Sequence, residues 1–241
     1  MVLNDDQSVT LNGDDSGCTA ELVTAVQPGN AAFVGSSFGG GAYITASLKW
    51  QPISSSSAKP LGWPAFWSMP LEGHMTPYSD QWPGQAQGYM DNIEADFFEA
   101  LPDEAGTAAY GGSLHNWYGI YLVSCAPAQQ CAPALPYSTG QRAVPAGTDF
   151  SQYHDYGFLW VPATASTNGY AKFYFDGVEV GYTFEWEQYR DQPPPPDNQP
   201  WAFGILDQRH LFLLLGTSQA QPMTVRSVDV WQASVADNIH H

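Results

Sequence analysis

The chain has 241 residues, of which 44% are hydrophobic and 14% aromatic, so it is long enough to bury a sizeable core. Its 24 acidic side chains against seven basic ones give a formal net charge of −17. This charge argues against nucleic acid, because phosphate binding needs a basic face, and against anionic membrane surfaces for the same reason. A neutral ligand fits best, and nine Trp and 13 Tyr offer flat faces for stacking.

The chain carries no sign of membrane insertion. No apolar run approaches the length of a transmembrane helix, and residues 1–6 lack the basic start and apolar core of a signal peptide. The final His240-His241 pair is typical of an expression tag. We therefore expect that a secretion signal has been removed and that the protein is extracellular or periplasmic.

Three cysteines leave at least one thiol unpaired. Cys125 and Cys131 are six residues apart and either clip a loop as a disulfide, with Cys18 free, or stay reduced. Spacing alone does not decide between these states.

Gly and Pro are spread along the chain, which suits many short strands joined by turns. Residues 1–30 are polar and acidic. Long loops are expected at 72–88 and 124–149, and Pro193 to Pro196 form a stiff connector. Alternating, aromatic or continuous apolar runs predict strands over 42–50, 62–70, the acidic run at 94–99, 114–123, 156–161, 171–175, 178–182, 211–215 and 223–231.

The clearest hairpin joins 171–175 to 178–182, because Asp176-Gly177 favours a type I′ turn. Within 62–70, Pro64 disfavours regular pairing at the start of the strand. No segment has long helical periodicity, and no composition shift divides the chain. We expect one all-β domain over residues 1–241, built of two packed antiparallel sheets.

The run Glu94-Ala95-Asp96-Phe97-Phe98-Glu99 places three carboxylates among apolar side chains. Such neighbours favour a strand over a solvated loop. Glu94 and Asp96 share a face of a regular strand, but Glu99 would point the opposite way. If the run is catalytic, we predict a β-bulge between Asp96 and Glu99, which returns Glu99 to the face of Glu94.

Three acids on one face favour a retained proton, because like charges and burial both oppose full ionisation. Two carboxylates facing one cleft are what glycoside hydrolysis needs, one as proton donor and the other as nucleophile or base. The alternatives are an edge strand with solvated acids and a calcium site.

At this point the chain resembles glycoside hydrolase family 16, the jelly-roll group of laminarinases, lichenases and agarases. The central signature Glu-x-Asp-x-x-Glu is present at 94–99. In the family's order, similar segments occur at Phe38–Lys49, Gly62–Trp67, His154–Trp160 and Phe173–Gly177. The resemblance covers about 38–232, with 1–30 and 233–241 peripheral.

The resemblance implies a β-jelly-roll sandwich with a substrate cleft on its concave face. It also implies roles for the three acids, with Glu94 as the nucleophile, Glu99 as the acid/base and Asp96 as the residue that tunes the pair. No cofactor is required by this chemistry. The expected partner is a polysaccharide, with no nucleic acid or membrane, and the protein is expected to be a monomer.

Five further residues are candidates for substrate binding. Trp63 and Trp67 are expected to line the cleft, although Trp on a sandwich strand is more often buried. His115 matches a His that the family places near the acid/base, and a hydrogen-bonded core position is its equal alternative. Tyr89 and Trp117 are candidate stacking platforms, with core packing as the alternative.

The chain departs from the family pattern at three places. Ser47 stands where many members carry Arg, and Leu215-Gly216-Thr217-Ser218 replaces a loop that lines one end of the cleft. Arg226 stands where many members have a calcium-ligating Asp. Because a cation would not tolerate Arg as a ligand, a structural calcium ion is disfavoured, and no metal ligands are assigned.

The sequence therefore predicts a retaining endo-glycosidase acting on a β-linked polysaccharide, most simply a β-1,3- or mixed-linkage β-glucan. A galactan hydrolase of the agar or carrageenan type and a transglycosylase are the nearest enzymatic alternatives. A non-catalytic carbohydrate-binding jelly roll and a calcium-dependent lectin-like module are the alternatives without turnover.

Overall fold

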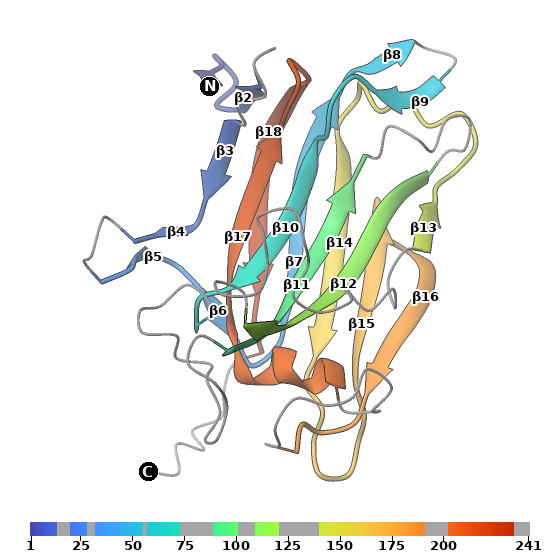
Figure 1. Ribbon diagram of the computed structural model, residues 1–241. Helices are drawn as coiled ribbons and strands as arrows, with labels where there is room; N and C mark the ends of the chain where they lie inside the picture. The colour runs from blue at the N-terminus through green and yellow to red at the C-terminus, as the bar shows by residue number, and fades with distance from the viewer. Residues whose placement is uncertain are drawn as a thin grey trace.

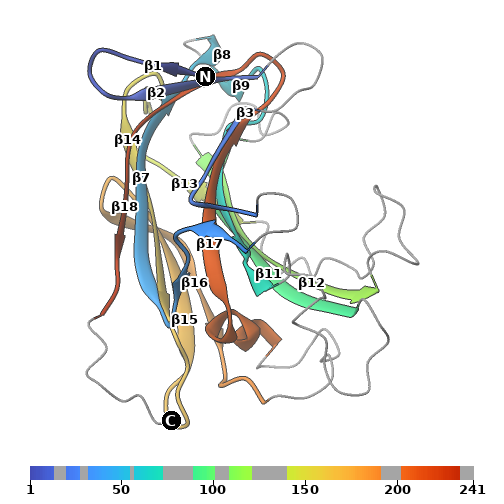
Figure 2. The ribbon, with the colours of Figure 1, turned by 90° about the vertical axis from the view of Figure 1, so that its left-hand side faces the viewer.

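The computed structural model describes residues 1–13, 20–27, 32–54, 57–72, 89–100, 109–120, 140–190 and 202–233. Two antiparallel sheets form two packed layers (Figure 1). We call them the outer sheet and the cleft sheet. Seen from the side, the cleft sheet bends away from the outer sheet along β11 and β12 (Figure 2).

The outer sheet has seven strands, and each neighbouring pair is antiparallel. In spatial order they are β1 Val2–Leu3, β2 Val9–Asn12, β18 Pro222–Trp231, β7 Ala42–Trp50, β14 His154–Val161, β15 Gly169–Phe175 and β16 Val178–Trp186. The first and the last strands of the described chain therefore lie near each other in one sheet.

The cleft sheet also has seven strands. Six follow in the order β13 Gly140–Ala143, β12 Ala109–Ile120, β11 Tyr89–Glu99, β10 Ala65–Pro70, β17 His210–Thr217 and β3 Ala20–Val23, and β6 Phe38–Gly39 pairs beside β17. Two small hairpins join β4 Ala25–Val26 to β5 Val34–Gly35 and β8 Pro52–Ser54 to β9 Ser57–Pro60.

One aromatic-rich core fills the space between the sheets. Phe97 of the cleft sheet stacks on Phe158 of the outer sheet with ring centroids 4.6 Å apart, and Phe98 lies 4.2 Å from Tyr156. All four rings are fully buried. Burying Phe side chains is among the largest single contributions to a core, about 1.5–3 kcal/mol each, so β11 is fixed from its inner face.

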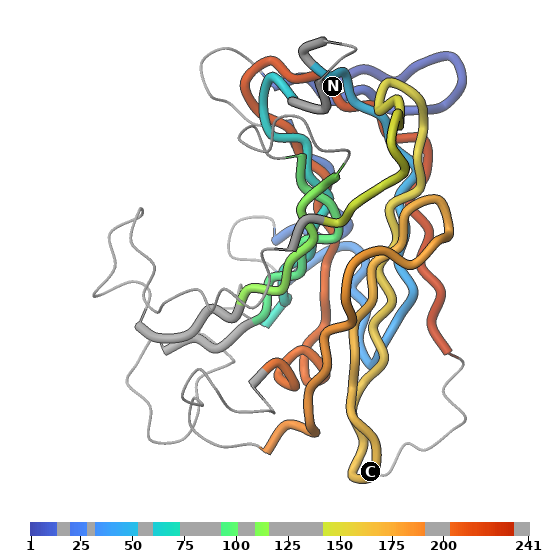
Figure 3. Tube along the Cα trace, turned by 90° about the vertical axis from the view of Figure 1, so that its right-hand side faces the viewer, coloured from blue at the N-terminus to red at the C-terminus, as the bar shows by residue number. Residues whose placement is uncertain are grey.

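The chain is therefore an all-β jelly-roll sandwich of two antiparallel sheets, as the sequence predicted. Strand β7 occupies the predicted 42–50, and β10 begins at Ala65, directly after Pro64. The predicted hairpin turn is present, with φ of +48° at Asp176 and +77° at Gly177. The tube view shows the loop between β14 and β15, at the opposite end of β15 from this turn, extending below the other strands (Figure 3).

Some elements were not predicted. Strand β13 lies inside the predicted loop 124–149, strands β1 to β4 lie inside the polar residues 1–30, and a 3-10 helix, η2, spans Ala202–Gln208. All five of these strands have only two to four residues, so their own sequences carry little periodicity and the pairing partner defines them.

Several predictions lie outside the described residues: the states of the three cysteines, the connector Pro193 to Pro196 and the loop over 73–88. In the described part of the chain, no helix has the length and apolar character needed to cross a membrane.

Candidate active site

The acidic run lies in the interior of the cleft sheet, because β11 pairs with β10 on one side and β12 on the other. The alternative of an edge strand with solvated acids is therefore wrong. The register slips between Asp96 and Glu99 against β12, and a matching slip occurs against β10. The predicted bulge is confirmed.

The bulge explains how the run serves two environments. Phe97 and Phe98 are consecutive, yet both are fully buried in the core, because the bulge breaks the alternation of faces. Glu94, Asp96 and Glu99 then all line one pocket. The core contacts of the two Phe rings fix the backbone from behind, and the acids face the opposite way.

The pocket has a volume of about 270 Å³. It is open to solvent and draws its walls from four strands of the cleft sheet and the segments that flank them. Its lining residues are Glu21, Trp63, Ala65, Trp67, Glu94, Asp96, Glu99, Gly216, Thr217 and Ser218. None of these is Lys or Arg, so the described lining carries only negative formal charge.

Asp96 is the most deeply buried of the three acids, with 6% of its side chain exposed. Its Oδ2 lies 2.9 Å from Nε2 of His115 on the neighbouring strand β12. Burial raises the pKa of Asp96, because a low-dielectric environment disfavours the charged form. His115 thus contacts an acid of the pocket, and a ring nitrogen of His115 lies within 4.8 Å of a carboxylate oxygen of Glu99, the expected acid/base.

Glu99 is held by Trp63, whose indole N–H donates to Oε1 at 3.0 Å. Burial raises the pKa of Glu99 to about 8, and the charges of Asp96 and Glu94 add to this effect, while His115 and the Trp63 hydrogen bond oppose it. Glu99 therefore keeps its proton at neutral pH, which is the state that an acid catalyst needs.

Both predicted tryptophans line the pocket. Trp63 is half exposed. Trp67 is half-buried and packs against a small apolar cluster of Ala25, Phe212 and Leu214 on the concave side of the sheet. The side chains of Tyr89 and Trp117 lie outside the described ones, so their proposed stacking roles stay predictions.

Asp96, Glu99 and His115 could also hold a metal ion, since one ligand atom from each lies within 4.8 Å of the others. A nitrogen donor with two carboxylates suits a transition metal better than calcium, which takes six to eight oxygen ligands.

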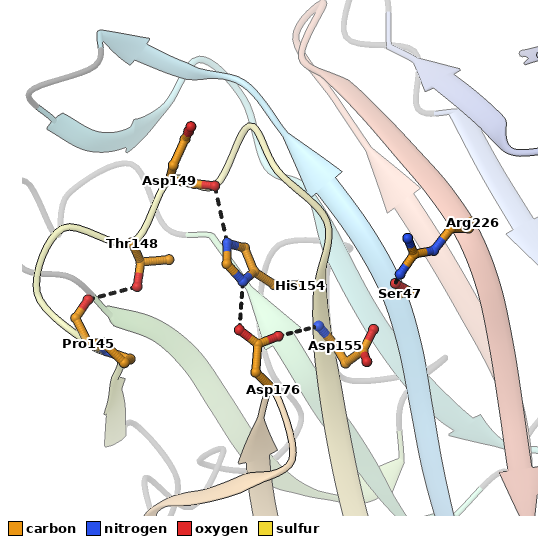
Figure 4. A network of polar contacts seen from close by, with 8 residues as sticks. All are labelled: Ser47, Pro145, Thr148, Asp149, His154, Asp155, Asp176 and Arg226. Carbon is orange, nitrogen blue, oxygen red and sulfur yellow. Dashed lines mark hydrogen bonds and ion pairs between the residues drawn. The ribbon is translucent and has the colours of Figure 1, made fainter.

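The calcium position that the resemblance implies lies on β18. There, Arg226 donates from Nη2 to Oγ of Ser47 at 2.7 Å (Figure 4), and its guanidinium lies 4.6 Å from the ring centroid of Tyr153. Two of the three departures from the family pattern, Ser47 and Arg226, thus contact each other. A guanidinium at this point does not suit a calcium ion, and the absence of a calcium requirement stays a prediction.

Five lining residues were not predicted as site residues: Glu21, Ala65, Gly216, Thr217 and Ser218. The departure at Leu215-Gly216-Thr217-Ser218 was a signal that this end of the cleft differs. Glu21 had no signal, because it becomes part of the pocket only through the pairing of β3 with β17.

No family model matches the chain, and no curated protein sequence matches it. Solved structures do. The catalytic domain of PdAgaC has a TM-score of 0.52 at 11% identity, covering 97% of this chain and 78% of its own. Endo-1,3-beta-glucanase from Streptomyces sioyaensis has a TM-score of 0.49 at 18% identity, and the match covers 88% of this chain and 75% of the glucanase chain. LamA from Zobellia galactanivorans, in complex with laminaritriose and laminaritetraose, has a TM-score of 0.47 at 12% identity, and the match covers 91% of this chain and 79% of the LamA chain. The first of these likenesses supports the fold described above.

Proposed function

We propose that this protein is a retaining glycoside hydrolase of the family 16 type that cleaves an uncharged β-linked polysaccharide within the chain. The observation that carries the proposal is the bulged strand β11. It presents Glu94, Asp96 and Glu99 to one pocket and raises the pKa of Glu99 to about 8. A protonated carboxyl group beside further carboxylates is the arrangement that glycosidic bond cleavage requires.

Glu99 is the acid in the first step. Its Oε1 accepts the hydrogen bond from Trp63, so the proton sits on Oε2 and is transferred from there to the glycosidic oxygen. Glu94 attacks the anomeric carbon as the leaving group departs, forming a covalent glycosyl ester.

The second step needs Glu99 as a base, and the electrostatics of the pocket favour that change. The charge of Glu94 is one cause of the raised pKa of Glu99. When Glu94 becomes a neutral ester, this cause disappears and the pKa of Glu99 falls. Glu99, now ionised, takes a proton from the water that attacks the ester, and Glu94 is released as a carboxylate.

Asp96 tunes both steps from between the two glutamates. Its charge also raises the pKa of Glu99, and the contact with His115 fixes the position of its carboxyl group. The His115 side chain therefore acts through Asp96 as a positioning residue.

The charge of the pocket favours a neutral polymer, and we propose a β-1,3- or mixed-linkage β-glucan as the substrate. A neutral galactan is the next candidate, and transglycosylation would use the same covalent ester with a sugar hydroxyl in place of water.

The test is to incubate the protein with laminarin, lichenan and agarose and to measure new reducing ends. We expect release from at least one polymer, with the β-anomer formed first by NMR. Glu94→Gln and Glu99→Gln should each lower kcat by at least about 10³-fold, whereas Glu185→Gln on β16, an exposed change of equal charge, should not.

Azide provides a further check on the nucleophile. In a Glu94→Ala variant, a small anion can enter the vacated space and attack the anomeric carbon, so added azide should restore bond cleavage with inversion. Binding of oligosaccharide without any reducing-end release would contradict the proposal and indicate a carbohydrate-binding module instead.

A further inference from the structure

A straight row of four residues crosses the cleft sheet at the level of Glu99. Glu99 is paired in register with Ala65, Ala65 with Gly216, and Gly216 with Glu21. All four line the pocket. Neighbouring strands lie about 4.8 Å apart, so the row spans about 14 Å between the backbones of β11 and β3. Two carboxylates stand at its ends, with the two smallest side chains between them.

The small residues leave room for the indole of Trp67 to lie over the row. A Cβ at Gly216 would be 2.8 Å from Cη2 of Trp67 and 3.1 Å from Cγ of Glu21. Real Cβ atoms do not approach this closely, so only glycine allows the ring to occupy this place. The apolar cluster beneath Trp67 fixes the ring against β17.

The position of Glu21 relative to Trp67 suits a sugar unit. A pyranose that stacks on an indole directs its hydroxyl groups outward in the plane of the sugar ring. A carboxylate beside the indole can accept hydrogen bonds from these hydroxyl groups. Hydrogen bonds to an ionised acceptor are about twice as strong as those to a neutral one. Glu21 is exposed, so it reaches the pocket without a large cost of burial.

The same carboxylate disfavours a charged sugar. Four acids line the pocket, and its lining residues include no Lys or Arg to offset them. Glu21 is separated from Glu94, Asp96 and Glu99 by two strands. It therefore extends the negative potential to a sugar unit beyond the one whose glycosidic bond is cleaved.

We propose that Glu21 is a specificity-determining residue. Its carboxylate accepts hydrogen bonds from the hydroxyl groups of an uncharged sugar unit stacked on Trp67, and it excludes units that carry sulfate or carboxylate. The proposal rests on the proposed function for the identity of the ligand as a polysaccharide. It adds the substrate class at the end of the pocket opposite the catalytic acids.

The test compares Glu21→Gln with wild type on one neutral polymer and on its carboxymethylated derivative, for example laminarin and carboxymethyl-laminarin. Loss of the ionised acceptor should lower kcat/KM on the neutral polymer about 3- to 10-fold. Loss of the repulsion should raise kcat/KM on the charged derivative, so that the ratio of the two changes about tenfold. Glu185→Gln, with the same charge change on the other sheet, should leave the ratio within about twofold of wild type.

Salt gives an independent measure. In the wild type, raising the ionic strength should increase relative activity on the charged derivative, because salt screens exposed charges. This increase should be smaller in Glu21→Gln than in Glu185→Gln. An unchanged ratio and an unchanged salt response in Glu21→Gln would overturn the proposal and leave Glu21 a solvated acid at the rim.

Failure of the proposed function would look different. If no polymer is cleaved, affinity electrophoresis in gels containing each polymer measures binding alone. Retardation by the neutral polymer that Glu21→Gln weakens and Glu185→Gln does not would support the role of Glu21 without turnover. Retardation that is equal in all three proteins would overturn it.

Discussion

Two histidine–aspartate pairs of nearly equal length lie in different regions of this protein. In the pocket, Nε2 of His115 is 2.9 Å from Oδ2 of Asp96. At the β15–β16 hairpin, Nδ1 of His154 is 2.8 Å from Oδ2 of Asp176 (Figure 4). The side chain of Asp96 is 6% exposed and that of Asp176 is 48% exposed. Their surroundings differ far more than their geometry.

The hairpin pair is a structural clamp. Nε2 of His154 also lies 3.1 Å from the carbonyl oxygen of Asp149, so both ring nitrogens face acceptors and both donate in the protonated form. Asp176 accepts a second hydrogen bond, from the backbone N–H of Asp155 at 2.9 Å. Three segments are thus tied at a turn whose aspartate has positive φ.

The surroundings of the pocket pair, by contrast, disfavour the charged form of its aspartate. Asp96 is buried beside two other acids, so burial and repulsion keep protons on the set and raise the pKa of Glu99. The partner alone therefore does not define the role of a histidine–aspartate pair. The burial of the pair and the charges around it decide whether it stabilises a loop or shifts the pKa of a neighbouring acid.

The largest expected effect is on stability, through Glu99. In the unfolded chain its pKa is near 4.5 and in the folded protein about 8, so between these values the unfolded state releases a proton that the folded state retains. The free energy of unfolding should fall as pH rises from about 4.5 to about 8, by several kcal/mol in total. Glu99→Gln should remove this contribution and be more stable than wild type at pH 8, but not at pH 4, in urea unfolding. Equal stabilisation at both pH values would contradict the proposed cause.

Asp96→Asn should have the next largest effect. It removes a charge that raises the pKa of Glu99 and replaces an acceptor of His115 with an amide. We expect kcat/KM to fall about 10²-fold and its alkaline limb to move to lower pH. The pH profile of kcat/KM on the cleaved polymer measures both. A fall in activity with an unmoved alkaline limb would limit Asp96 to positioning.

The local geometry of both regions was predictable from the sequence. The bulge was predictable because Glu94 and Glu99 have an odd spacing and a catalytic run needs them on one face. The hairpin was predictable from Asp176-Gly177. Both signals are local. Glu21 was not predictable, because β3 has four residues and enters the pocket only by pairing with β17, which is about 190 positions later in the chain.

The same limit applies to Arg226 and Ser47. Each was recognisable from the sequence as a departure from the family pattern, but their contact depends on the pairing of β18 with β7, whose register slips between Val225 and Ser227. Alternation predicts that a strand exists and which face is buried. It does not specify which strand lies beside it.

His154→Gln tests whether the pair of His154 and Asp176 stabilises the hairpin. Glutamine cannot place one nitrogen beside Asp176 and another beside the Asp149 carbonyl as the imidazole ring does, so we expect a loss of about 1–2 kcal/mol in stability, or roughly 3–6 °C in Tm for a chain of this size. Catalytic activity below the unfolding temperature should be unchanged. A variant with normal Tm and reduced activity would show that the hairpin pair is coupled to the pocket.

The smallest effect is expected from Trp63→Phe, and its informative result is the direction in which the pH profile moves. The ring remains to line the pocket, but the N–H that donates to Oε1 of Glu99 is lost. Because that hydrogen bond lowers the pKa of Glu99, its removal should move the alkaline limb of kcat/KM to higher pH, opposite to Asp96→Asn, with a few-fold loss in kcat/KM. Since the two substitutions touch the same carboxyl group, opposite shifts in one pH profile would identify Glu99 as the titrating acid. Shifts in the same direction would mean that another group sets that limb.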